Sequence, residues 1–320
     1  MTFAPSKPTP KGLFRRTPPA IFPPILGLMG LGIAWRRGVG AFALPSGAVE
    51  LFLGGVTLIA LFALLAYGVK IARRPGVVIE DLRILPGRAG LAAAVLTLYL
   101  VAAALGPYGG FAQGIFWGAA LLHLALIATV IRVFATGPAE QRRVNPVWQL
   151  TFSGWIVGAI AGLALGLTTP ALVMFWVALI SASAIWVISI GQFARERVPA
   201  PLRPLLAIHL APAALLGTVA TGFEASGIAA VMAGLAAAYL LVLLLSVRWL
   251  TAAGFSPLWG AFTFPATAAA GCFLAQGGDW TIPGAVVLIA ATVIVIPIAV
   301  KVLQLWAKGQ LALKTNAAIA

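Results

Sequence analysis

Residues 255–271 read FSPLWGAFTFPATAAAG and contain no charged side chain. With its neighbours, this stretch is long enough to cross a lipid bilayer as a helix. Two prolines and two glycines interrupt it, which a plain membrane anchor does not need. Phe262 and Phe264 lie two positions apart, so a helix turns their side chains about 200° from each other. The two rings must therefore face different surroundings.

The composition of the whole chain is that of a membrane protein. Of the 320 residues, 62% are hydrophobic and only 9% are charged, and the mean hydropathy is +1.05. A soluble domain of this length carries far more charge. The single cysteine, Cys272, excludes a disulfide framework and a CxxC metal site. We predict an all-α polytopic membrane protein with no metal site and no cofactor.

Ten apolar spans, each of about 20 residues, follow one another along the chain. They cover approximately residues 20–36, 49–70, 89–107, 111–133, 147–168, 170–193, 204–223, 227–247, 254–275 and 283–305. Short connections pair them as five helical hairpins. The sequence therefore predicts a transmembrane domain over 20–305, between a cytoplasmic N-terminal segment, 1–19, and a cytoplasmic C-terminal tail, 306–320.

The distribution of basic residues predicts the orientation. The chain has 21 Lys and Arg. All except Arg36 and Arg37, and thus 19 of them, fall on the side that carries both termini. The positive-inside rule places that side in the cytoplasm. Because the basic residues are confined to alternate loops, the net charge of +14 does not indicate a nucleic-acid partner. Residues 1–19 are polar and do not form a cleavable signal peptide.

Proline falls mainly on the odd-numbered spans. Span 7 has Pro204 and Pro212, and span 9 has Pro257 and Pro265, whereas Pro297 in span 10 is an exception. An interior proline frees a backbone carbonyl, which is costly in lipid unless protein or water satisfies it. The odd helices are therefore expected to face the inside of the bundle.

The glycines of span 5 and the two histidines each allow more than one role. Four glycines of span 5 repeat every four residues: Gly154, Gly158, Gly162 and Gly166. This stripe indicates close helix packing, a bare backbone wall along a pore, or both on different parts. His123 is expected to make a structural hydrogen bond between helices, although it could relay protons. His209 precedes the bend at Pro212 and is a candidate to line the interior.

The helical phase of span 9 separates its two central phenylalanines. Bulky residues share one face: Phe255, Trp259 and Phe262, with Ala266. Small or bent positions share the other face with Phe264: Pro257, Gly260, Ala268 and Gly271. A single large ring on a helix face of otherwise small residues can plug a pore, or it can fill a gap left by glycines of a neighbouring helix. Pro265 is expected to bend the helix beside it.

Acidic residues and motifs exclude several classes of protein. None of the seven Asp and Glu residues lies near the middle of a span, which argues against a proton-driven pump. The chain has no Walker A motif, no GxGxxG at a strand–helix junction and no cluster of catalytic residues. We therefore predict that it is not an enzyme.

The chain resembles the tellurite-resistance/dicarboxylate transporter family, which includes bacterial TehA proteins and the plant guard-cell slow anion channel. The most specific motif is W-x-x-[FY]-[ST]-F-P at Trp259 to Pro265, supported by FPPILGLMGLGIAW in span 1 and HLAPAALLG in span 7. The resemblance implies an inner ring of odd helices around a central pore and an outer ring of even helices. It also implies homotrimers with one pore in each protomer, and a phenylalanine, here Phe264, that occludes the pore.

Three functions remain open from the sequence. The first is a channel or facilitator for small inorganic or organic anions in the bacterial inner membrane, with a pore that lacks fixed charge. Its pore-lining or hinge residues would be Pro212, Gly260, Pro265, Ala268 and His209. The alternative is a secondary transporter of C4-dicarboxylates or of oxyanions such as tellurite or sulfite. A dianion would favour an arginine inside the membrane, and Arg132 and Arg248 lie at helix ends. The third is a membrane scaffold.

Overall fold

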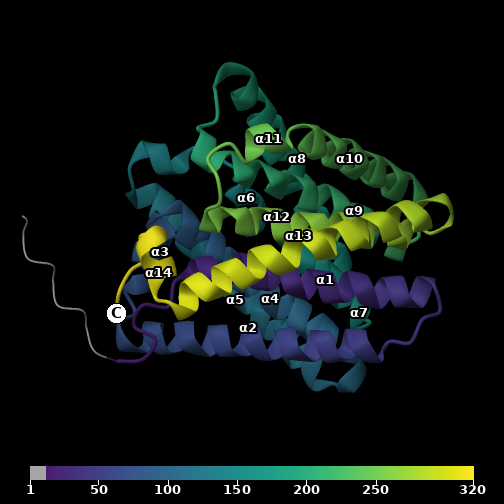
Figure 1. The fold of residues 1–320 in the computed structure, drawn as a ribbon, viewed down its shortest axis with the longest axis horizontal. Coiled ribbons are helices and arrows are strands. Elements are labelled where there is room, and N and C mark those ends of the chain that lie inside the picture. Colours follow the sequence, from purple (N-terminus) through teal and green to yellow (C-terminus); the bar gives the residue numbers. More distant parts are fainter. Residues whose placement is uncertain (1–11) are drawn as a thin grey trace, which may run out of the picture.

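The computed structural model describes residues 12–320, and over this part of the chain it is built of helices without strands. Ten helical segments are long and apolar enough to cross a membrane, which confirms the predicted fold class. In chain order these spans are α1 (Phe22–Ala41), α2 (Gly47–Arg73), α4 (Leu85–Leu105), α5 (Phe111–Thr136), α6 and α7 (Val147–Phe152 and Trp155–Ala164), α8 (Thr168–Arg195), η4 and α9 (Ala200–His209 and Leu210–Gly222), α10 (Ser226–Leu245), α12 (Gly260–Gln276) and α13 (Thr281–Ala307) (Figure 1).

Short helical turns extend several spans or connect them. They are η1 (Pro19–Ile21), α3 (Val77–Arg83), η2 (Gly106–Tyr108), η3 (Ala139–Arg142), α11 (Val247–Leu250), η5 (Pro257–Trp259), η6 (Gly278–Trp280) and α14 (Gln310–Lys314). Prolines stand at the starts of η1, η5 and α4, where the missing N–H is not needed for an intrahelical bond. The proline-rich start of span 7 forms a 3-10 helix before α9 begins.

The end of the first span differs from the prediction. The predicted span ended at approximately residue 36, whereas α1 continues to Ala41. Both charged side chains have partners on neighbouring helices. Arg36 binds the carboxylate of Glu50 from α2, and Arg37 donates to the carbonyl of Gly271 in α12.

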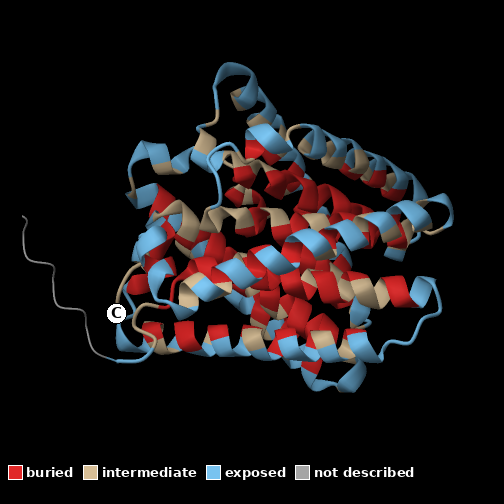
Figure 2. Cartoon of the chain, viewed as in Figure 1, coloured by how far each residue is buried: buried red, intermediate tan, exposed pale blue. Residues whose placement is uncertain are grey.

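Odd and even spans differ in burial. Between 67% and 83% of each odd-numbered span is buried, against 17% to 33% of each even-numbered span. Figure 2 shows this contrast between the buried interior and the exposed outer helices. Each even span exposes large apolar side chains, for example Leu58, Leu121, Val187, Leu245 and Val293. Such a surface suits contact with lipid or with other protomers, whereas water would disfavour it.

The five buried spans contact one another in a closed order. α1 packs on α4, α4 on α7, α7 on α9 and α9 on α12, and α12 packs back on α1. Each of them also packs against the even span that follows it in the chain, as in α1 with α2 and α12 with α13. The bundle therefore has a middle made of helices that have little contact with its surroundings.

Glycines allow the buried helices to approach closely. A Cβ atom added at Gly30 of α1 would lie 2.9 Å from the Phe264 ring of α12, and one at Gly158 would lie 2.7 Å from the sulfur of Met174. A Cβ at Gly162 would lie 3.0 Å from Ala171. Gly158 and Gly162 thus pack against neighbouring side chains, which favours the packing interpretation for this part of the stripe, whereas a Cβ at Gly166 would meet nothing within 4 Å.

Residues from both ends of the chain meet at one end of the bundle. The ammonium of Lys70 in α2 lies 2.8 Å from the carboxylate of Asp81 in α3, and both side chains are fully buried. Tyr67 donates a hydrogen bond to the same carboxylate, and so does the backbone N–H of Ala318. Lys70 also donates to the carbonyl of Thr17. This cluster links α2 and α3 to segments near both termini.

Candidate functional site

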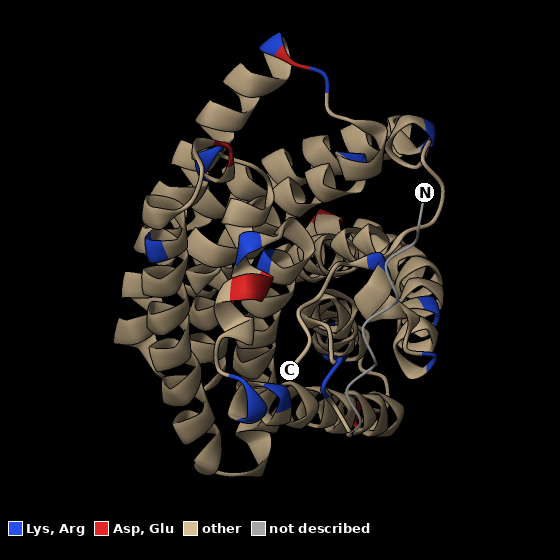
Figure 3. Ribbon diagram, turned by 90° about the vertical axis from the view of Figure 1, so that its left-hand side faces the viewer, with Lys and Arg blue, Asp and Glu red and all other residues tan. Residues whose placement is uncertain are grey.

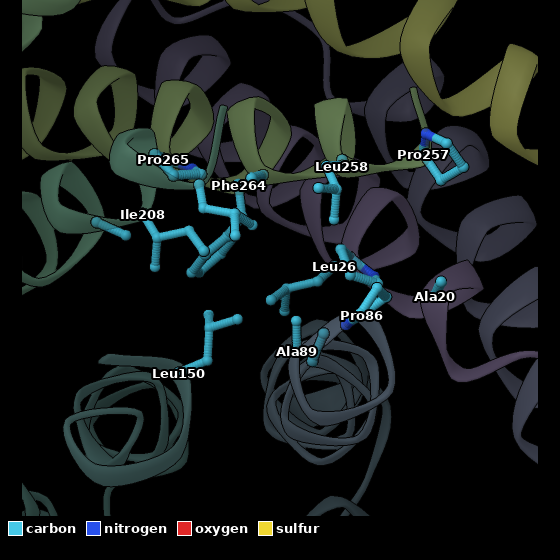
Figure 4. A pocket seen from close by; sticks show the side chains of 16 residues that line it. Ala20, Leu26, Pro86, Ala89, Leu150, Ile208, Pro257, Leu258, Phe264 and Pro265 are labelled. Atoms are coloured by element: carbon cyan, nitrogen blue, oxygen red, sulfur yellow. The ribbon is translucent and has the colours of Figure 1, made fainter. Parts of the chain in front are cut away.

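An apolar cavity lies where the five buried spans begin. The volume inside it that can hold the centre of a water molecule is only about 40 Å³. Its lining residues are Ala20, Pro23, Leu26, Pro86, Ala89, Ala93, Leu150, Leu205, Ile208, Ala211, Pro257, Leu258, Gly260, Ala261, Phe264 and Pro265. Each of the five buried spans contributes at least one of them, and none carries a charge. Figure 4 shows side chains from separate helices converging on this space.

Phe264 lies at this cavity on the α12 side. The residue is 5% exposed, and its ring lies against α1 at Gly30. In Figure 4 it points into the space that Ile208 and Leu150 border from other helices. The hydroxyl of the nearby Thr267 donates to the Phe264 carbonyl, and Thr267 is not among the residues that line the cavity. The largest side chain on the cavity wall therefore lies in the tight contact between α1 and α12.

Phe262 faces different surroundings. It is half-buried, and its ring lies 5.8 Å from that of Trp259, measured between centroids. Trp259 in turn contacts Phe255, with centroids 5.5 Å apart. Phe262 is absent from the cavity lining. The two phenylalanines thus point in the separate directions that their spacing requires.

The structure brings together some of the residues expected at a pore and separates others. Gly260 and Pro265 line the cavity with Phe264, whereas Pro212 and Ala268 are buried outside its lining. His209 is also outside it and borders a second cavity between α8, η4 and α10. Its ring nitrogen Nδ1 lies 3.4 Å from the Gln149 amide. His209 and Phe264 thus border different cavities, and a pore-lining role for His209 stays a prediction.

Sequence analysis missed several residues of the cavity wall. Leu26, Leu150 and Ile208 line it, and each resembles any other apolar residue of a membrane span. To find them, one would have to know which face of spans 1, 5 and 7 points toward the interior. Pro86, at the start of span 3, was visible in the sequence as a helix-entry proline.

His123 serves as a structural residue within the described bundle. Its Nε2 lies 2.9 Å from the carbonyl oxygen of Thr151, so this nitrogen must donate the hydrogen bond. The ring stacks on Trp155 at 4.2 Å, and Tyr99 lies within 3.5 Å of the other nitrogen. These contacts join α5 to span 5 and favour the structural interpretation. Within residues 12–320, no group of three or more potential metal ligands lies together.

The electrostatic potential in the cavity is set by the backbone dipoles of the surrounding helices and by the charged side chains around its mouth. Because all five buried spans begin here, the positive ends of their helix dipoles point toward the same region. Basic side chains surround this end of the bundle, which Figure 3 views from the side of the C-terminus. An anion entering the cavity thus meets no fixed negative charge in the lining and several favourable dipoles.

The sequence of the chain matches a known protein family. The family model described as the voltage-dependent anion channel, SLAC1, matches residues 16–306. The chain belongs to this family. The match confirms the resemblance seen in the sequence and covers all ten spans. Members of this family are membrane channels, so the protein is an integral membrane protein and not an enzyme. No curated protein matched the chain.

Proposed function

We propose that this member of the family conducts small anions through the centre of its five buried spans, and that Phe264 occludes the path. The observation that carries the proposal is the uncharged cavity at the start of these spans, bounded by the Phe264 ring. The closed order of contacts from α1 through α12 supports an inner ring of odd helices around a pore and an outer ring of even helices.

The properties of the cavity favour anions over cations. Helix N-termini supply partial positive charge without a tightly binding side chain, which suits conduction. The basic rim raises the local concentration of anions at the mouth. Selectivity among anions would then follow the cost of removing their water in an apolar passage. Pro265 and Gly260 belong to this wall, while Pro212, Ala268 and His209 would act behind it.

A second candidate is a secondary transporter of C4-dicarboxylates or oxyanions. One observation favours it: α1 extends far enough to carry Arg37 inside the bundle. A doubly charged substrate would benefit from such a fixed cation. The two candidates differ in coupling, because a channel passes ions only down their own electrochemical gradient.

Anion flux into liposomes tests the proposal. Purified protein is reconstituted, and uptake of chloride and nitrate is measured at several membrane potentials, with and without a pH gradient. We expect flux that follows the potential and the anion gradient and is unchanged by the pH gradient. Accumulation against the anion gradient, driven by pH, would instead support the transporter. Protein-free liposomes give the background leak.

We also propose that both termini lie in the cytoplasm. The support is the basic asymmetry of the sequence, because the end of the bundle with the cavity mouth also carries most Lys and Arg. Reporter fusions after Lys314 and within the turn at 276–279 should report opposite sides of the membrane. A C-terminal reporter on the outside would reverse the orientation of the pore.

The family resemblance further supports a homotrimer in a bacterial inner membrane, with a separate pore in each protomer. The apolar outer faces of the even spans are compatible with contacts between protomers as well as with lipid. In this arrangement, residues 1–19 and 306–320 flank the channel domain at 20–305 on the cytoplasmic side. The particle mass of the purified protein, corrected for bound detergent, measures the oligomeric state.

A further inference from the structure

Arg37 lies on the helix face that leads to Phe264. It follows Gly30 by seven residues in α1, and Gly271 follows Phe264 by seven residues in α12. Seven residues are almost two full turns, so each pair shares a helix face and is separated by roughly 10 Å along the axis. Because Gly30 contacts the Phe264 ring, Arg37 and Gly271 meet on the same line, farther from the cavity mouth.

The guanidinium of Arg37 has one hydrogen bond to the protein. Its Nη1 donates to the carbonyl of Gly271 at 2.8 Å, and no carboxylate of the described residues forms an ion pair with it. The neighbouring Arg36 is fully engaged by contrast. It binds both oxygens of Glu50, at 2.8 and 2.5 Å, and the carbonyl of Ala104.

The remaining donors of Arg37 border open space. The side chain is half-buried, and its nitrogens are not among the unpartnered atoms that are sealed from solvent. A Cβ atom added at Gly271 would find only Arg37 Nη1 at 3.5 Å and Ala34 at 3.9 Å, whereas one at Gly30 would collide. The absence of a side chain at Gly271 therefore leaves room beside the guanidinium.

A guanidinium in this position calls for an anion. It always carries a positive charge in a protein, and because no carboxylate neutralises that charge, an anion that reaches the open donors gains a charge-assisted hydrogen bond. Its free Nε and Nη2 donors lie side by side in one plane. That fork matches two oxygens of a planar oxyanion, such as nitrate or a carboxylate group.

We propose that Arg37 forms an anion-binding site for planar oxyanions in the pore, beyond Phe264 as seen from the cavity. The role of this site in conduction rests on the proposed anion path. Anion binding at Arg37 does not depend on that path, because it can occur without flux. An anion that has passed the ring would pause at Arg37 before it leaves, or would first bind there when it enters from the other side.

Nitrate-dependent thermal unfolding tests the site directly. The melting temperature of the purified protein is measured as nitrate replaces a bulky sulfonate, MES, at constant ionic strength. In the wild type we expect a saturable rise with nitrate. In Arg37→Gln the half-saturating nitrate concentration should increase at least tenfold, or the rise should vanish. The same nitrate dependence in Arg37→Gln and wild type would overturn the site.

Two further variants separate binding from structure. Arg36→Gln removes the adjacent arginine, which lies beside the site without belonging to it. Its melting temperature without nitrate can differ from that of the wild type, but the rise with nitrate should have the same half-saturating concentration. Arg37→Lys keeps the charge but lacks the fork, so its half-saturating concentration should rise several-fold for nitrate. If Arg37→Gln does not fold, Arg37→Lys tests the proposal in its place. A half-saturating nitrate concentration in Arg37→Lys equal to that of the wild type would contradict the proposal.

Flux measurements distinguish failure of the site from failure of the channel. In a Phe264→Ala background, adding Arg37→Gln should lower nitrate flux at low nitrate concentration and reduce the preference for nitrate over chloride. Arg37-dependent stabilisation without any liposome flux would preserve the binding site and refute the channel. Normal flux with Arg37-independent stabilisation would preserve the channel and refute the site.

Discussion

Phe264→Ala is expected to raise anion flux in liposomes on the order of tenfold or more over the wild type. A factor of ten corresponds to about 1.4 kcal/mol of barrier, which a dewetted constriction readily exceeds. Phe264 is the largest side chain of an otherwise small or aliphatic lining, and its neighbour Gly30 has no side chain to fill the space that it leaves. Because water would enter the widened passage, the gain should extend to several anions. Flux is measured for chloride and nitrate at matched protein density.

Phe262→Ala is the matched control. It removes the same ring two residues away, from a half-buried position that contacts Trp259 outside the cavity. We expect flux near the wild-type value and a loss of stability below the 3–5 kcal/mol, roughly, of a fully buried Phe→Ala change. Equal flux from Phe264→Ala and wild type, with both proteins folded, would remove the gate. A leaky Phe262→Ala would show that the conducting path lies on the other face of α12.

The parts of the fold that composition and periodicity control could be predicted from the sequence. Ten apolar spans follow from hydropathy, and the buried position of the odd spans follows from where proline is tolerated. The separation of Phe262 and Phe264 follows from helical phase alone. These features depend on residues that are near one another in the sequence.

Features that depend on contacts between distant residues could not be predicted. The charges of Arg36 and Arg37 indicated the end of span 1, but Glu50 and the Gly271 carbonyl allow the helix to continue. The position of His209 at the second cavity depends on how the 3-10 helix η4 packs against α8 and α10, which residues near it in the sequence do not determine. The contact of Arg37 with α12 was therefore missed, and so was the second cavity beside His209.

The second large expectation concerns the buried ion pair of Lys70 and Asp81, which lies at the same end of the bundle as the cavity. Asp81→Ala should destabilise the protein by roughly 3–5 kcal/mol, because it leaves the buried Lys70 ammonium without its carboxylate. The change also removes the acceptor for Tyr67 and for the backbone N–H of Ala318. The midpoint of unfolding in a denaturing detergent measures the loss. Protease accessibility of the C-terminal segment should increase at the same time.

A double substitution identifies the source of this loss. If the cost comes from an uncompensated charge, Lys70→Met combined with Asp81→Leu should recover most of the stability, because apolar groups of similar size can replace a buried ion pair. If the cost comes mainly from releasing Ala318, the double variant should remain as unstable as Asp81→Ala and as sensitive to protease. Anion flux should be unaffected in the folded fraction of either variant, since Lys70 and Asp81 are not among the residues that line the cavity. A change in the flux of folded protein would mean that the cluster linking α2, α3 and the chain ends also controls the width of the pore.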